Sequence, residues 1–146
     1  MHIAAISGSL KMDSSNTNIL KAIATFAPEN VHITVVTALE KLPHFNPEIE
    51  AGNEFVNDFR SQIKKADGVI FSTPEYAFGV PGSLKNALDW LVSSGELNEK
   101  PIAAISASPL YTGGDKALAS LLLTLTALGT NFNAQSSLRI GNIKIK

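Results

Sequence analysis

Apolar residues in this chain follow two alternating patterns. Short runs rich in β-branched residues, typical of buried strands, occupy positions 3–6, 31–36, 69–71 and 102–106. The tail 131–145 is expected to form a last strand, or two short ones. Between the runs, apolar residues recur at helical spacing, and the predicted helices cover about 16–26, 55–65, 84–92 and 116–128.

Residues at the ends of these helices support the assignment. Ser14, Ser15 or Asn16 can cap the first helix, and Gly129 is well placed just after the last one. The run 31–36 alternates apolar and polar residues, as an edge strand would.

Strands and helices therefore alternate from the first strand to a fifth. This order predicts a doubly wound, five-stranded parallel sheet with helices on both faces, a three-layer α/β/α architecture in one domain covering 1–146. The last helix that usually follows the fifth strand is absent, so something else must cover part of one face.

Composition narrows the functional classes. Twelve basic and thirteen acidic residues give a net charge of −1, which favours neither nucleic acid nor an anionic membrane. The absence of cysteine excludes disulfides and thiolate chemistry and fits the cytoplasm. The three histidines are scattered without ligand spacing, so no metal site is predicted. We expect neither a signal peptide nor a membrane span, and a small molecule is the expected partner.

The first candidate site is the polar loop between the first strand and the first helix. It contains Gly8-Ser9-Leu10-Lys11 and, further on, Ser14 and Asn16. A helix N-terminus offers free backbone N–H groups, to which hydroxyls and a lysine add donors, so these are the parts of a phosphate cradle. The loop has neither a Walker ending nor the Rossmann glycine fingerprint, and a serine-rich capping loop explains the same residues about equally well.

Two further loops follow the strands 69–71 and 102–106. In the loop 74–83, backbone donors can meet the polar edge of a flat heterocycle while Tyr76 or Phe78 lies against its face. The loop 107–115 contains Gly113-Gly114, where backbone can approach a ligand closely. Taken singly, each loop is better explained as a structural connection. Together they favour a site, because all three loops fall at one end of the sheet, around the point where strand order reverses.

These motifs resemble the NADPH-dependent FMN reductases, a flavodoxin-like family that includes azo, quinone and chromate reductases. The matching stretches are Gly8 to Lys11 with Ser14 and Asn16, Pro74-Glu75-Tyr76, and 81–90. The resemblance implies that the FMN phosphate is held by Ser9, Lys11, Ser14 and Asn16. It implies that the isoalloxazine ring is held by Pro74, Glu75, Tyr76, Ala77 and Phe78, and that its pyrimidine end is approached by Ser108 and Gly113.

The chain departs from the family pattern at three points. Lys11 stands where the family usually has arginine, so the point charge of an ammonium group replaces a guanidinium that can form two hydrogen bonds to a phosphate. Ala77 stands where asparagine is common. The third difference is that the family continues into a last helix after its fifth strand, which the predicted elements of this chain do not include.

The resemblance implies an oxidoreductase that passes a hydride from NADPH or NADH through bound FMN to a small-molecule acceptor, such as a flavin, a quinone, an azo compound or a metal oxyanion. The flavin supplies the chemistry, so no catalytic side chain is predicted. An alternative is a flavodoxin-type electron-transfer module without its own substrate, although such carriers are usually acidic around the flavin. A relative that has lost its flavin is a second alternative.

We also expect a homodimer or homotetramer in the cytoplasm. The resemblance implies association through the helix after the Pro-Glu-Tyr motif, here 84–92, which bears Trp90, a residue type enriched in interface centres. The alternative is that Trp90 packs in the core of its own chain.

Overall fold

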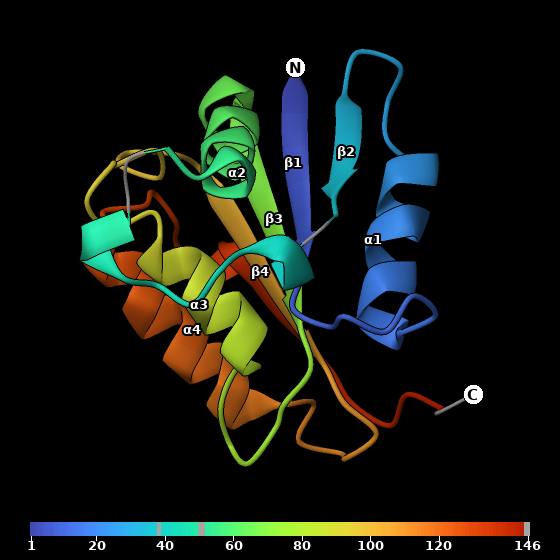
Figure 1. The fold of residues 1–146 in the computed structure, drawn as a ribbon. Coiled ribbons are helices and arrows are strands. Elements are labelled where there is room, and N and C mark those ends of the chain that lie inside the picture. Colours follow the sequence, from blue (N-terminus) through green and yellow to red (C-terminus); the bar gives the residue numbers. More distant parts are fainter. Residues whose placement is uncertain (38, 50–51, 145–146) are drawn as a thin grey trace.

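The structure is a computed structural model that describes residues 1–37, 39–49 and 52–144. Five strands alternate with four helices in the order predicted (Figure 1). Their bounds are β1 His2–Ser7, α1 Ser15–Thr25, β2 His32–Val36, α2 Glu54–Lys65, β3 Gly68–Thr73, α3 Gly82–Asp89, β4 Ile102–Ala107, α4 Asp115–Ala127 and β5 Ser137–Ile140. Short 3-10 turns lie at Leu39–Lys41, Pro47–Ile49 and Ala134–Ser136.

The strands form one parallel sheet in the order β2-β1-β3-β4-β5. This order confirms the doubly wound fold, and β2 is an edge strand as its alternating pattern predicted. In the tail, the strand is limited to Ser137–Ile140. It starts late because Asn133 accepts a hydrogen bond from the N–H of Gln135 and closes a 3-10 turn before it. Residue 145, the end of the predicted tail strand, lies outside the described residues.

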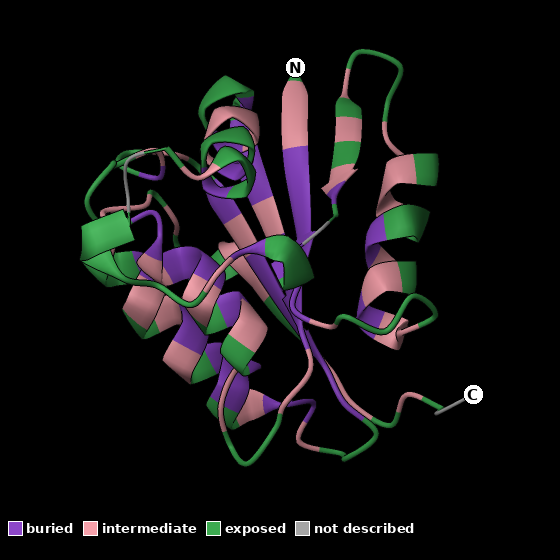
Figure 2. Ribbon diagram, in the orientation of Figure 1, coloured by how far each residue is buried: buried purple, intermediate pink, exposed green. Residues whose placement is uncertain are grey.

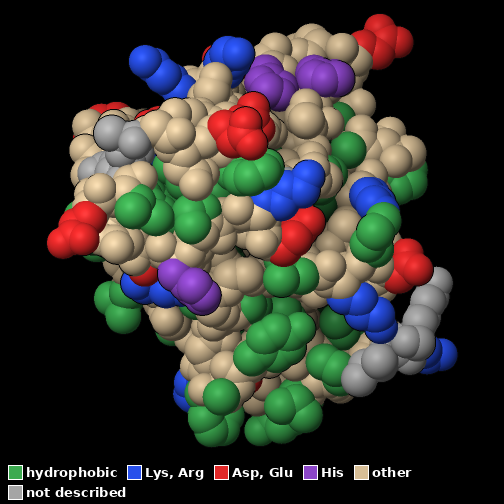
Figure 3. All heavy atoms as spheres, in the orientation of Figure 1, with side chains coloured by type: hydrophobic (Ala, Val, Ile, Leu, Met, Phe, Trp, Pro, Cys, Tyr) green, Lys and Arg blue, Asp and Glu red, His purple; other side chains and the backbone are tan. Residues whose placement is uncertain are grey.

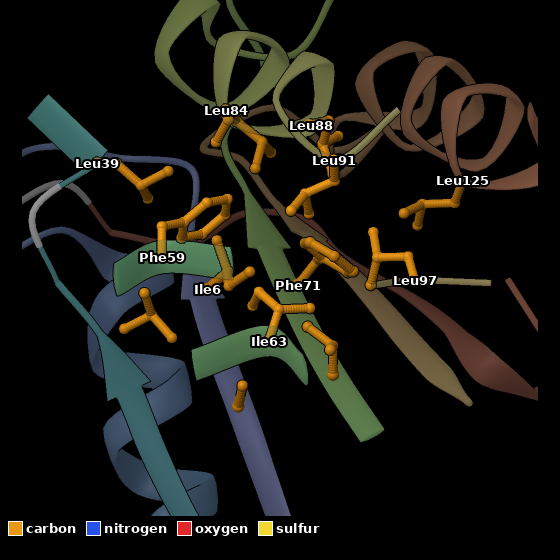
Figure 4. Packing of buried hydrophobic residues seen from close by; sticks show 14 of the residues in the cluster. Ile6, Leu39, Phe59, Ile63, Phe71, Leu84, Leu88, Leu91, Leu97 and Leu125 are labelled. Carbon is orange, nitrogen blue, oxygen red and sulfur yellow. The ribbon is translucent and has the colours of Figure 1, made fainter. Parts of the chain in front are cut away.

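The sheet separates α1 from the other three helices (Figure 1). Apolar side chains of α2, α3 and α4 pack on one face of the sheet, where Ile6 of β1 and Phe71 of β3 are completely buried (Figure 4). On the opposite face, α1 lies over β1, β2 and β3 and buries Leu20. A parallel sheet normally has both faces covered, so this layering explains why its strands are almost continuously apolar.

Part of the α1 face is less well covered. In the described part of the chain no helix follows β5, as expected from the sequence. Ile70 and Ala103 are only partly buried, and Leu138, which pairs with Ile105 in register, is 54% exposed. Figure 2 shows β1 partly exposed at its start and buried over the rest, whereas exposed and partly buried positions alternate along the edge strand β2.

Trp90 contradicts one expectation. Its side chain is completely buried inside its own chain, just after α3. The expectation that Trp90 lies at the centre of an interface between chains is therefore wrong, and the alternative, packing in its own core, is confirmed.

Candidate functional site

Three loops meet at the carboxyl end of the sheet, in the lower half of Figure 1. The first loop (residues 8–14) follows β1, the second loop (74–81) follows β3, and the third loop (108–114) follows β4. β1 and β3 are neighbours, yet the helices that follow them lie on opposite faces of the sheet. This is the switch point at which open α/β sheets bind ligands, and the structure brings the three predicted loops together there.

Asn16 joins the ends of β3 and β4 beneath these loops. Its side chain, in the first turn of α1, accepts a 2.8 Å hydrogen bond from Ser72 Oγ at the end of β3. It also donates a 3.3 Å hydrogen bond to the carbonyl oxygen of Ala107 at the end of β4. The residue is only 3% exposed, so its side chain supports the site from within.

The first loop and the start of α1 present unpaired backbone donors. Ser14 is the N-cap of α1, and its Oγ accepts a 3.0 Å hydrogen bond from the N–H of Thr17. Among the contacts of the described residues, the N–H groups of Met12, Asp13 and Ser15 have no protein acceptor. Donors of this kind at a helix N-terminus suit a phosphate group.

Gly8 lets the first loop lie against the neighbouring strand and helix. A Cβ at this position would lie 3.1 Å from Thr73 Oγ1 and 3.1 Å from Leu84 Cδ2. Both distances are shorter than ordinary van der Waals contact, so a side chain here would push the first loop away from β3 and α3.

A hollow of about 320 Å³ opens beside the first loop, between α1 and the end of β2. Ser9 and Lys11 line it, and so do Thr17, Lys21 and Glu40. Lys21 belongs to none of the sequence motifs that indicated the site. The i, i+4 spacing of Thr17 and Lys21 on α1 is the signal that could have placed both side chains on the face of the first loop.

The second loop folds into a tight hairpin. Tyr76 and Gly79 exchange backbone hydrogen bonds of 3.0 and 2.9 Å. Between them, Ala77 and Phe78 both have positive φ, 48° and 60°, the pattern of a two-residue type I′ turn. The side chains of Tyr76 and Phe78 are 57% and 75% exposed. Both aromatic side chains are therefore exposed to solvent and do not pack inside the domain.

Glu75 in the second loop contacts the helix that follows the third loop. Its Oε2 accepts a 2.9 Å hydrogen bond from the N–H of Ala117 in the first turn of α4. The side chain is therefore engaged within the protein.

The third loop is anchored to the C-terminal segment. Ser108, which is buried, donates its N–H to the carbonyl oxygen of Ile140 at 3.0 Å, and its own carbonyl accepts from the N–H of Ile143. Gly113 has φ 66°, and a Cβ there would lie 3.1 Å from the backbone of Ile140 and Gly141. Internal packing therefore explains both residues, and a ligand contact by either one stays a prediction.

Tyr111, at the tip of the third loop, is an aromatic residue that the predicted site left out. Its side chain is 84% exposed, and it lines a polar hollow with Thr112, Asp115 and Arg139. Hydrophobic side chains gather at this end of the molecule in Figure 3. The exposed large ones on the second and third loops are Tyr76, Phe78, Leu110 and Tyr111.

Charged side chains of both signs are interspersed on the face that Figure 3 presents. Within residues 1–37, 39–49 and 52–144, no group of three or more His, Cys, Asp or Glu is placed to hold a metal ion. No helix in this part of the chain is long and apolar enough to cross a membrane.

The sheet order and the three loops at its switch point define a flavodoxin-like α/β protein. Comparison of sequences then identifies the family. The chain belongs to the NADPH-dependent FMN reductases, whose family profile matches residues 1–143.

Individual relatives agree with this assignment. The chain is similar to a quinone reductase of Pseudomonas putida, with 38% identity over 119 residues, and to a quinone reductase of Escherichia coli, with 30% identity over 139 residues. These matches cover 77% and 90% of this chain but 62% and 74% of the two relatives. The chain thus spans between three fifths and three quarters of their length.

A solved structure is similar as well. It is the flavoenzyme NAD(P)H:(acceptor) oxidoreductase FerB of Paracoccus denitrificans, with a TM-score of 0.85 and 30% sequence identity. The superposition covers 93% of this chain and 77% of that one.

Proposed function

We propose that this chain is an NAD(P)H-dependent oxidoreductase that binds FMN and reduces a small-molecule acceptor of the quinone type. The observation that carries the proposal is the set of unpaired N–H groups on the first loop, which lies beside two loops with exposed aromatic side chains. A phosphate at one end and a flat ring at the other match these two features. The names of the relatives from Pseudomonas putida and Escherichia coli support the class of acceptor.

The residues present fit FMN. Met12, Asp13 and Ser15 would offer backbone donors to the phosphate, and Lys11 would add a positive charge. Ser9 lines the same hollow as Lys11 and would add its hydroxyl. These donors lie on one loop and the helix start that follows it, which suits the one terminal phosphate of FMN better than the longer diphosphate of FAD.

The second loop would hold the ring. Tyr76 and Phe78 would lie against its face, and Pro74 and Ala77 would fix the backbone beside its polar edge. FMN, when bound, supplies the hydride chemistry by accepting electrons from NADPH or NADH and passing them on. The part of the protein is to position the ring and leave one face open to nicotinamide and acceptor in turn.

The decisive experiment starts from the purified full chain. We expect a flavin absorption spectrum, or uptake of FMN on titration, with FMN rather than FAD identified by chromatography of the released cofactor. Without oxygen, NADPH should bleach the flavin, and a benzoquinone should restore its colour. Failure to take up FMN would contradict the proposal. Bleaching that no quinone, flavin, azo compound or metal oxyanion reverses would favour an electron-transfer module.

We also propose that the chain forms a homodimer or homotetramer and works in the cytoplasm. Exposed apolar side chains support self-association, since Phe26 on the α1 side of the sheet is 86% exposed and Leu138 is 54% exposed. Light scattering over a range of concentrations tests the oligomeric state. A stable monomer at micromolar concentration would contradict the proposal.

A further inference from the structure

Helix α4 begins without a side-chain cap of its own. Its N-cap residue is Gly114, which has φ 76° and carries no hydrogen-bonding side chain. The first N–H groups of a helix need acceptors from elsewhere, because no turn precedes them. Here the acceptor for Ala117, the third helical residue, comes from the second loop, 42 residues earlier in the chain.

Glu75 provides this acceptor. Its Oε2 lies 2.9 Å from the nitrogen of Ala117, in the place that a capping side chain normally occupies. Its Cβ also lies close to Gly114, where an added Cβ would be 3.4 Å away. Gly114 thus lets the second loop and the start of α4 come into direct contact.

This contact connects the two loops that would hold the flavin ring. The second loop carries Tyr76 and Phe78 immediately after Glu75, and the third loop ends at Gly114, where α4 begins. A carboxylate is well suited to the contact, because the N-terminal end of a helix has a partial positive charge. Neither loop can move away from the other without breaking the hydrogen bond.

We propose that Glu75 is a positioning residue that does not itself contact the flavin. By accepting a hydrogen bond from the N-terminus of α4, it fixes the second loop relative to the third loop for flavin binding. The inference rests on the proposed function, since it concerns the same site. It assigns Glu75 a different role from the direct flavin contact that the family resemblance implies.

Two substitutions separate the two roles. Glu75→Ala removes the acceptor, whereas Glu75→Gln keeps an oxygen at the same distance along the side chain and loses only the charge. Glu48→Ala is a matched control, because Glu48 is an exposed carboxylate in the turn Pro47–Ile49. Affinity for FMN and for riboflavin is measured by quenching of flavin fluorescence, and amide exchange at Ala117 is measured in the flavin-free protein.

We expect Glu75→Ala to weaken FMN and riboflavin by a similar factor of about 3 to 30, the range that loss of a helix cap gives. Exchange at Ala117 should accelerate by a comparable factor. Glu75→Gln should retain most of the affinity and most of the protection at Ala117, and Glu48→Ala should behave as the wild type.

Two results would overturn the inference alone. One is a Glu75→Gln protein that binds flavin as weakly as Glu75→Ala while Ala117 stays protected, since the carboxylate would then contact the ligand. The other is a Glu75→Ala protein with unchanged flavin affinity. A wild-type chain that takes up no flavin would instead overturn the proposed function, and this inference with it.

Discussion

The indole Nε1 of Trp90 donates a 2.9 Å hydrogen bond to the carbonyl oxygen of Pro43. The same oxygen accepts a second 2.9 Å hydrogen bond from Asn86 Nδ2, and the ring of Phe45 meets the indole edge-on at 5.0 Å between centroids. The long connection between β2 and α2 is thus fixed to the end of α3. Trp90 stabilises the fold of its own chain through this contact.

We therefore expect Trp90→Phe to lower the free energy of unfolding by about 1–3 kcal/mol, through the lost hydrogen bond and the smaller ring. Urea unfolding followed by circular dichroism measures the loss. The oligomeric state should not change, because the side chain is buried within one chain. A variant of unchanged stability that dissociates into monomers would show instead that Trp90 acts between chains.

Much of the fold could be predicted because hydrophobic spacing is a local signal. The start of α1 and the glycine after α4, Gly129 with φ 72°, follow from the few residues around each helix end. The contacts of Trp90 could not be predicted, because they depend on residues 47 positions away in the chain. The same distinction between local signals and contacts of distant residues applies to the site. Its loops were visible as motifs, whereas the internal partner of Glu75 depends on the tertiary arrangement.

Ala77 offers a test of backbone strain in the second loop. Left-handed backbone costs an ordinary residue roughly 1–2 kcal/mol, and asparagine tolerates it better than alanine does. With φ 48° at this position, Ala77→Asn should raise the free energy of unfolding by about 0.5–1 kcal/mol. Chemical denaturation of the flavin-free protein measures the change.

A β-branched residue at the same position is the matched control. Ala77→Val should destabilise the protein, because a branched Cβ is poorly compatible with positive φ. If Ala77→Asn and Ala77→Val changed stability equally, backbone conformation would not be the cause.

Lys100 closes the C-terminal end of α2 from a different part of the chain. Its Nζ donates hydrogen bonds to the carbonyl oxygens of Ile63 at 2.6 Å and of Ala66 at 2.8 Å. Lys64 and Lys65 lie in the last turn of α2 and also bring positive charge to this helix end. Both are exposed, and neither closes the helix in this way.

Lys100→Met keeps the length of the side chain but removes its donors. We expect the free energy of unfolding to fall by about 1.5–3 kcal/mol, the range for hydrogen bonds to a charged group. Lys65→Met should change it by less than about 0.5 kcal/mol, as is usual for exposed positions. Thermal unfolding of the two variants compares the sites directly, and equal losses would contradict the special role of Lys100.

Lys11 tests the phosphate end of the proposed site. Its side chain is exposed and lines the hollow beside the first loop, so its charge would act on the phosphate and not on the ring. Lys11→Ala should therefore weaken FMN by about 10- to 100-fold, as expected for one charge-assisted contact, and leave riboflavin binding unchanged. Lys11→Arg should bind FMN more tightly, because a guanidinium can form two parallel hydrogen bonds to a phosphate.

Lys64→Ala, at the far end of α2, controls for the loss of a positive charge. Fluorescence titrations with both flavins measure all three variants, and equal losses for FMN and riboflavin in Lys11→Ala would mean that Lys11 does not bind the phosphate.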